Sequence, residues 1–165
     1  MRDHEIREIS GGWTGTDETV RAIEELVRES LTDPLVVSEA RDIVRFVPER
    51  DRDAELRAVS AYVRSKIRYT SETVETLATP HRMVEEIRKY GRTTGDCDEA
   101  VTLWLAFLRI LGHRVRVRVV SQIPDGRANH IFGETFSASR GSWITDDTIV
   151  KKRPLGWSIP KEQIT

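Results

Sequence analysis

The single cysteine of the 165-residue chain, Cys97, stands where a polar, glycine-containing segment meets the most apolar run of the sequence. Asp96 is a favourable N-cap residue, and Glu99 three positions later completes the reciprocal capping pattern of a helix start. A helix that begins here places Cys97 beside free backbone N–H groups and the positive end of the helix dipole. Such an environment lowers the pKa of a thiol from about 8.5 toward roughly 3.5–7.5, which predicts a nucleophile. The carboxylates of Asp96 and Asp98 would oppose thiolate formation if they faced the sulfur, and would favour it if they capped the helix instead. The alternative is a small, buried apolar residue.

A nucleophilic cysteine needs a base that takes its proton, and His130 is the best placed of the four histidines. It opens a predicted strand over 129–137, after a predicted turn at 124–126 that would bring the strand end toward a helix N-terminus. His113, by contrast, lies at the far end of the predicted cysteine helix, roughly 20 Å or more from the sulfur. Otherwise His130 would be a half-exposed strand residue.

The acid that orients this base is expected at the end of the next predicted strand, where Asp146 and Asp147 follow Trp143-Ile144-Thr145. Adjacent residues of a strand point to opposite faces, so at most one of the two acids can face His130. A carboxylate there would hold the imidazole tautomer and stabilise the imidazolium. The alternative for both acids is a solvated turn.

The elements that position these residues follow from the period of the apolar residues. Amphipathic helices are expected over about 16–31, 34–44 and 53–67, with a shorter one over 80–90. The cysteine helix, to about residue 111, is apolar on nearly every side and should be buried. The period then changes from 3.6 to 2, and we expect an antiparallel meander of three strands. Residues 1–15 are expected to form a loose N-terminal arm and 92–95 a loop. Helices first and strands afterwards predict an α+β fold in one domain, 16–165.

The first strand alternates arginine and valine over 114–119. Its three arginines could form a phosphate-binding stripe, but a solvated strand face is the more frequent arrangement. The net charge of −1 gives no field that favours nucleic acid or an anionic membrane. One cysteine excludes an intramolecular disulfide and a zinc site of several thiolates, and we expect no metal or cofactor. No signal-peptide or membrane-span pattern is present, which predicts a cytoplasmic protein.

The motif Gly95-Asp96-Cys97, the strand opening His130-Ile131-Phe132 and the Trp143-to-Asp147 segment, taken in order, resemble the transglutaminase-like superfamily. The resemblance covers roughly residues 55–157, and Tyr69 also resembles the flank of the family pattern. It implies a papain-like fold, with the cysteine helix packed on a small antiparallel sheet. Carried over, it implies Cys97 as nucleophile, His130 as base and acid, and an aspartate as orienter. Spacing from Trp143 selects Asp147, whereas an Asp-x-Thr match selects Asp146; we favour Asp147, which shares a strand face with Trp143.

The implied reaction is acyl transfer at an amide of a protein or peptide substrate, through a thioester on Cys97. Water is the default acceptor, and transfer to an amine is the second possibility. The backbone N–H of Cys97 is a candidate oxyanion donor. The remaining alternative is a binding or structural module that keeps the fold without catalysis.

Overall fold

The computed structural model describes residues 6–8, 12–70, 76–120, 130–148 and 155, with side chains from residue 17 onward in the first helix. The turn expected at 124–126 and the strand position 129 lie outside this part of the chain. No helix within the described ranges combines the length and apolar character needed to cross a membrane. The helices are α1 Gly12–Ser30, α2 Pro34–Val44, α3 Arg52–Lys66, α4 Pro80–Tyr90 and α5 Cys97–Ile110. The strands are β1 Ile6–Glu8, β2 Ile67–Tyr69, β3 Thr76–Ala78, β4 Thr93–Gly95, β5 Val115–Val120, β6 His130–Ser137 and β7 Ser142–Asp146.

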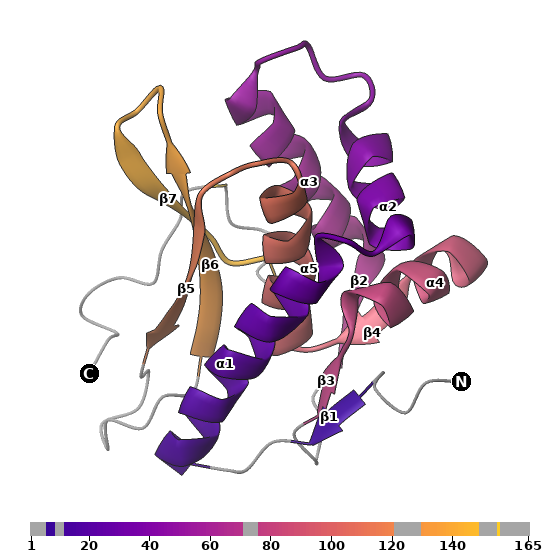
Figure 1. Ribbon diagram of the computed structural model, residues 1–165, viewed down its shortest axis with the longest axis vertical. Coiled ribbons are helices and arrows are strands. Elements are labelled where there is room, and N and C mark those ends of the chain that lie inside the picture. The colour runs from indigo at the N-terminus through magenta and orange to yellow at the C-terminus, as the bar shows by residue number, and fades with distance from the viewer. Residues whose placement is uncertain (1–5, 9–11, 71–75, 121–129, 149–154, 156–165) are drawn as a thin grey trace.

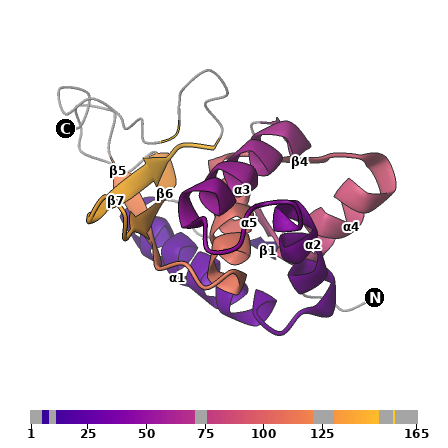
Figure 2. The same cartoon turned by 90° about the horizontal axis from the view of Figure 1, so that it is seen from above.

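The cysteine helix α5 is the centre of the molecule, as its all-round apolar sequence predicts. It packs against α1, α2 and α3, and against β6 of the three-stranded sheet. Figure 2 shows this sheet on one side of α5, with α2 and α4 on the other. Trp104 and Phe107 of α5 are fully buried, and the indole N–H of Trp104 donates to the hydroxyl of Ser60 on α3 at 2.9 Å. A helix enclosed in this way cannot shift without disturbing several elements, so its N-terminus is a rigid base for a site.

The three predicted strands form one antiparallel sheet in the order β5-β6-β7. The sheet meets α5 through Gly133, where an added Cβ would lie only 2.4 Å from Trp104. On the opposite face, Arg116 and Arg118 both bind the buried carboxylate of Glu134, at 2.5 and 3.1 Å. The arginine face is therefore half-exposed, as expected, but Glu134 compensates part of its charge.

Two local predictions differ from the structure, and both concern strands of three residues. The arm expected over 1–15 contains β1, which pairs antiparallel with β3, and α1 already begins at Gly12. The loop expected at 92–95 contains β4, which pairs in parallel with β2 so that Gly95 lies opposite Tyr69. A strand of three residues is too short to show an alternating pattern of apolar and polar residues. Its position depends on the distant strand with which it pairs.

Candidate active site

The start of α5 has the capping chemistry that the sequence predicts. The side chain of Asp96 accepts a hydrogen bond from the backbone N–H of Asp98 at 2.8 Å, and Glu99 accepts one from the backbone N–H of Asp96 at 3.0 Å. Cys97 is the first residue of the helix. The reciprocal bonds fix where the helix begins, and so they fix the position of the sulfur.

Glu99 also connects the helix start to two strands. Its second carboxylate oxygen accepts the N–H of Ala78 in β3 at 3.2 Å, and its side chain lies against Gly95 of β4. A Cβ at Gly95 would approach the Cβ of Glu99 to 2.6 Å, so this contact requires glycine. Burial, together with the neighbouring carboxyl of Asp96, raises the pKa of Glu99 to about 8. The carboxyl group that joins the helix start to β3 therefore titrates near pH 8.

The thiol of Cys97 is held between a carboxylate and a strand. Its S–H points to Asp98, with the sulfur 3.4 Å from Oδ1, while the backbone N–H of Ile131 donates to the sulfur. Burial raises the pKa of the Cys97 thiol strongly, and the charges of Asp98 and Asp96 raise it further. The lowered pKa expected from the helix position is therefore wrong for this arrangement. Desolvation and two nearby carboxylates outweigh the stabilisation of the thiolate by one N–H donor.

His130 is the first residue of β6, as predicted, and its imidazole is bound to an acid. Its Nε2 lies 2.7 Å from Oδ2 of Asp147, and the two side chains are only 10% and 4% exposed. This bond leaves Nδ1 as the ring nitrogen available for another partner. The next residue, Ile131, is the one whose N–H reaches the sulfur of Cys97. The start of β6 thus lies beside the start of α5.

The other described histidines are bound to acids elsewhere. Nδ1 of His81 lies 2.8 Å from Asp33, and Nε2 of His113 lies 3.0 Å from Glu55. The first contact joins α4 to the N-cap of α2, and the second joins α3 to the segment after the far end of α5. His130 is next to Ile131, whose backbone N–H donates to the sulfur of Cys97. No contact within the described residues places His81 or His113 beside the sulfur in this way.

The neighbouring acid Asp146 has a different environment from Asp147. Its carboxylate is fully buried and forms an ion pair with Arg64 of α3. Burial raises the pKa of Asp146, while Ser60 and Arg64 oppose the rise. Sequence reasoning missed Arg64, although its position four residues after Ser60 and eight after Leu56 places it on the buried stripe of α3.

Tyr69 completes the surroundings of the sulfur. It ends β2, beside Gly95, and half of its surface remains exposed. Burial raises the pKa of the Tyr69 phenol, and the charges of Cys97 and Asp96 raise it further. The phenol and the thiol are thus close enough for their charges to interact.

Asp96, Cys97 and Asp98 have ligand atoms within 4.8 Å of one another, which is close enough to hold a cation. One oxygen of Asp96 is already used for the helix cap, however, and the thiol already donates to Asp98.

Comparisons with known proteins identify the family and the fold of the chain. The sequence model of the transglutaminase-like superfamily matches residues 38–148, which is more than half of the chain. The crystal structure of a "putative cysteine protease" from Cytophaga hutchinsonii is similar in fold, with a TM-score of 0.53 and 14% sequence identity. The similarity covers 78% of this chain and 39% of the other, so the chain spans about two fifths of that protein. None of the curated proteins matches the sequence. The expected α+β, papain-like fold and the expected family are both confirmed, and the chain belongs to the transglutaminase-like superfamily.

Proposed function

We propose that the protein is an acyl-transfer enzyme in which Cys97 attacks an amide carbonyl, His130 moves the proton and Asp147 orients the imidazole. One observation carries this proposal. Nε2 of His130 is bound to Asp147 at 2.7 Å, at the start of the strand whose next residue donates its N–H to the sulfur of Cys97. Base and thiol thus come from two adjacent element starts, and the orienting acid directly follows the end of β7. The superfamily and the fold both support a cysteine-type hydrolase or acyltransferase.

The raised pKa of the Cys97 thiol determines how the first step proceeds in this proposal. The resting sulfur keeps its proton at neutral pH, so Nδ1 of His130 must accept that proton as the sulfur attacks the carbonyl carbon. This is general-base catalysis, as in serine hydrolases, and differs from attack by a preformed thiolate. Asp147 then stabilises the imidazolium that forms.

The remaining steps use the same side chains and the acceptor. The new S–C bond gives a tetrahedral intermediate, whose oxyanion the backbone N–H of Cys97 can bind; loss of such a donor costs about 10²–10³-fold in rate. His130 returns its proton to the leaving amine as the C–N bond breaks and the thioester forms. Water or a second amine then attacks the thioester, and the thiol of Cys97 is regenerated.

The acceptor decides between two enzyme activities. Hydrolysis is the first candidate, because water reaches any partly exposed site. Transfer to an amine is the second, since the carboxylates of Asp96 and Asp98 lie next to the sulfur and would attract a cationic acceptor.

A glutamine-containing peptide, incubated with the protein with and without a primary amine, tests these activities. Peptide cleavage indicates a peptidase, ammonia release without the amine indicates deamidation, and amine incorporation indicates acyl transfer. Each product should disappear in Cys97→Ser. If a panel of peptides yields none of the three products, and Cys97→Ser behaves like the wild type, the fold serves binding or structure and the catalytic proposal is wrong.

A further inference from the structure

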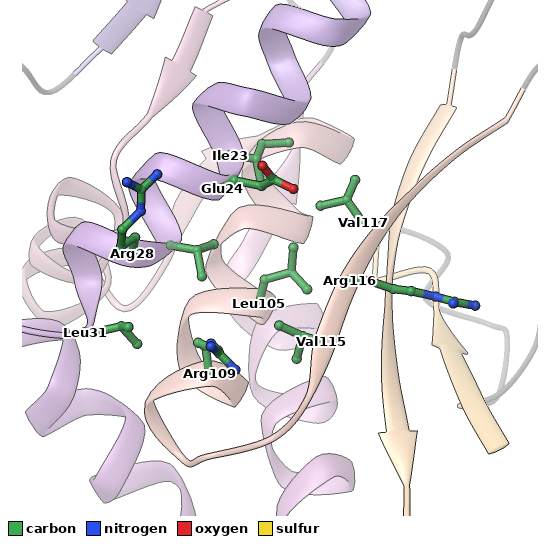
Figure 3. A pocket seen from close by; sticks show the side chains of 10 residues that line it. Ile23, Glu24, Arg28, Leu31, Leu105, Arg109, Val115, Arg116 and Val117 are labelled. Atoms are coloured by element: carbon green, nitrogen blue, oxygen red, sulfur yellow. The ribbon is translucent and has the colours of Figure 1, made fainter. Parts of the chain in front are cut away.

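A groove lies between α1 and the sheet, along the half of α5 that is remote from Cys97 (Figure 3). Its cavity volume is about 390 Å³. The floor is apolar, and the rim carries Glu24, Arg28 and Arg109. Arg116 of β5 also borders the groove, but its side chain points to the opposite face of the strand (Figure 3). The apolar side chains come from α1, from α5 and from β5, and they are Ile23, Val27, Leu31, Leu105, Val115 and Val117.

One wall of the groove is the edge strand β5, which pairs only with β6 among the described strands. In its register, Arg116 lies opposite Glu134, and the N–H of Phe136 donates to the carbonyl of Arg114. Residues of an antiparallel ladder alternate between bonding the neighbour and facing away from it. The backbone groups of Val115, Val117 and Val119 therefore point to the open edge. Figure 3 shows the side chains of Val115 and Val117 directed into the groove.

The surroundings of this edge are rich in positive charge. Arg28 and Arg109 stand exposed on the rim, and neither has a carboxylate partner among the described residues. Arg114, Arg116 and Arg118 line the other face of β5, where the single carboxylate of Glu134 binds two of them. Five arginines thus lie near the edge, and among the described residues that line the groove or pair with β5 the acids are Glu24 and Glu134.

We propose that the open edge of β5 binds an extended peptide in which acidic and apolar residues alternate. The peptide adds a strand beside β5, so its backbone bonds the free N–H and C=O groups of the three valines. One face of an added strand lies over the groove and must be apolar. The opposite face lies beside the arginines of β5 and must be acidic, because opposite charges on neighbouring strands attract. Arg28 and Arg109 attract acidic groups to the groove entrance.

A second copy of the chain fits this edge less well. Antiparallel pairing of β5 with itself sets arginine against arginine: a register centred on Arg116 places Arg114 against Arg118, and one centred on Val117 places Arg116 against Arg118. Like charges that face each other across strands are destabilising, and charged edge residues commonly prevent such pairing. Charge therefore favours an acidic partner over self-association.

The direct test measures the fluorescence anisotropy of a labelled (Glu-Val)₄ peptide during titration with the full chain. Two comparison peptides separate charge from strand addition: (Lys-Val)₄, and (Glu-Val)₄ N-methylated at the alternate residues that would face β5. We expect both to bind at least about tenfold more weakly. Hydrogen exchange should slow at the amides of Val115, Val117 and Val119 when (Glu-Val)₄ binds.

Variants test the rim. The double variant Arg28→Glu/Arg109→Glu should bind at least about tenfold more weakly, whereas Arg41→Glu on the exposed face of α2 should bind as the wild type does. Circular dichroism verifies that each variant is folded. Absence of binding by wild-type protein overturns the proposal, and so does equal binding of the three peptides. A dimer that protects the β5 amides and resists the peptide would assign the edge to a second copy instead.

Discussion

Arg64 of α3 forms an ion pair with Asp146, the residue that directly precedes the His130 partner Asp147. The two adjacent acids thus have different partners. Asp146 binds Arg64 of α3 at the end of β7, and Asp147 binds the imidazole of His130. Because α3 is packed on α5 through Ser60 and Trp104, the ion pair fixes β7 relative to the helix that carries Cys97. The geometry of the candidate site therefore depends on a residue that lies outside it.

Exchange of the two acids for asparagine should separate these roles. Asp147→Asn should leave the fold intact but reduce turnover by roughly 10²–10⁴-fold, because the imidazolium loses its carboxylate and the tautomer is no longer fixed. Asp146→Asn leaves the largely buried guanidinium of Arg64, whose side chain is 17% exposed, without its counter-ion and should lower the free energy of unfolding by about 3 kcal/mol. Denaturant unfolding and steady-state turnover measure the two effects. Equal activity losses and equal destabilisation in both variants would contradict this division.

The thiol of Cys97 should react slowly with iodoacetamide at neutral pH. Burial and the charges of Asp98 and Asp96 raise its pKa, so we expect an alkylation midpoint above the value of about 8.5 for free cysteine. Asp98→Asn removes one of these charges and should move the midpoint to lower pH. The pH dependence of alkylation, followed by mass spectrometry, measures both shifts.

His130→Ala is the matching test for the base. If His130 acts as proposed, this variant loses turnover. Its alkylation midpoint should nevertheless move less than that of Asp98→Asn, because the resting thiol is protonated in the proposed mechanism. A wild-type midpoint well below 8.5 would instead mean that the resting site holds a thiolate paired with an imidazolium.

Local sequence patterns were sufficient to predict the capping residues Asp96 and Glu99, the burial of α5 and the opening of β6 at His130. These features depend on neighbours three or four positions away, or on alternation within one strand. Helix position alone predicted a lowered pKa for Cys97, and this direction is wrong. Whether Asp96 and Asp98 oppose the thiolate depends on whether they face the sulfur, and that, like burial, is a property of the whole fold. The ion pair of Arg64 joins residues 82 positions apart, and a single chain gives no signal for such a partner.

The buried carboxyl of Glu99 should make stability depend on pH. Its pKa is about 8 in the folded protein, against about 4.3 in an unfolded chain. The folded state therefore holds this proton more tightly, so the stabilisation is complete below about pH 4.3 and is lost as the pH rises through about 8. Between pH 5 and pH 8, the free energy of unfolding of the wild type should fall. The fall should exceed that of Glu99→Gln, whose side chain does not titrate, by at least about 2 kcal/mol. Parallel pH profiles of the two proteins in urea unfolding would contradict the assignment.

Position 133, where the backbone of Gly133 lies against the indole of Trp104, should accept no side chain. A Cβ at position 133 would meet the indole at 2.4 Å, and Trp104 is enclosed by the core and bonded to Ser60. Gly133→Ala should therefore destabilise the protein by about 1–3 kcal/mol, as overpacking of a core commonly does. The steric origin can be verified with a double-mutant cycle. Trp104→Leu is itself destabilising, but it makes room for the new methyl group, so Gly133→Ala should cost less in that background. An identical cost in both backgrounds would show that the glycine is required for its backbone and not for the indole beside it.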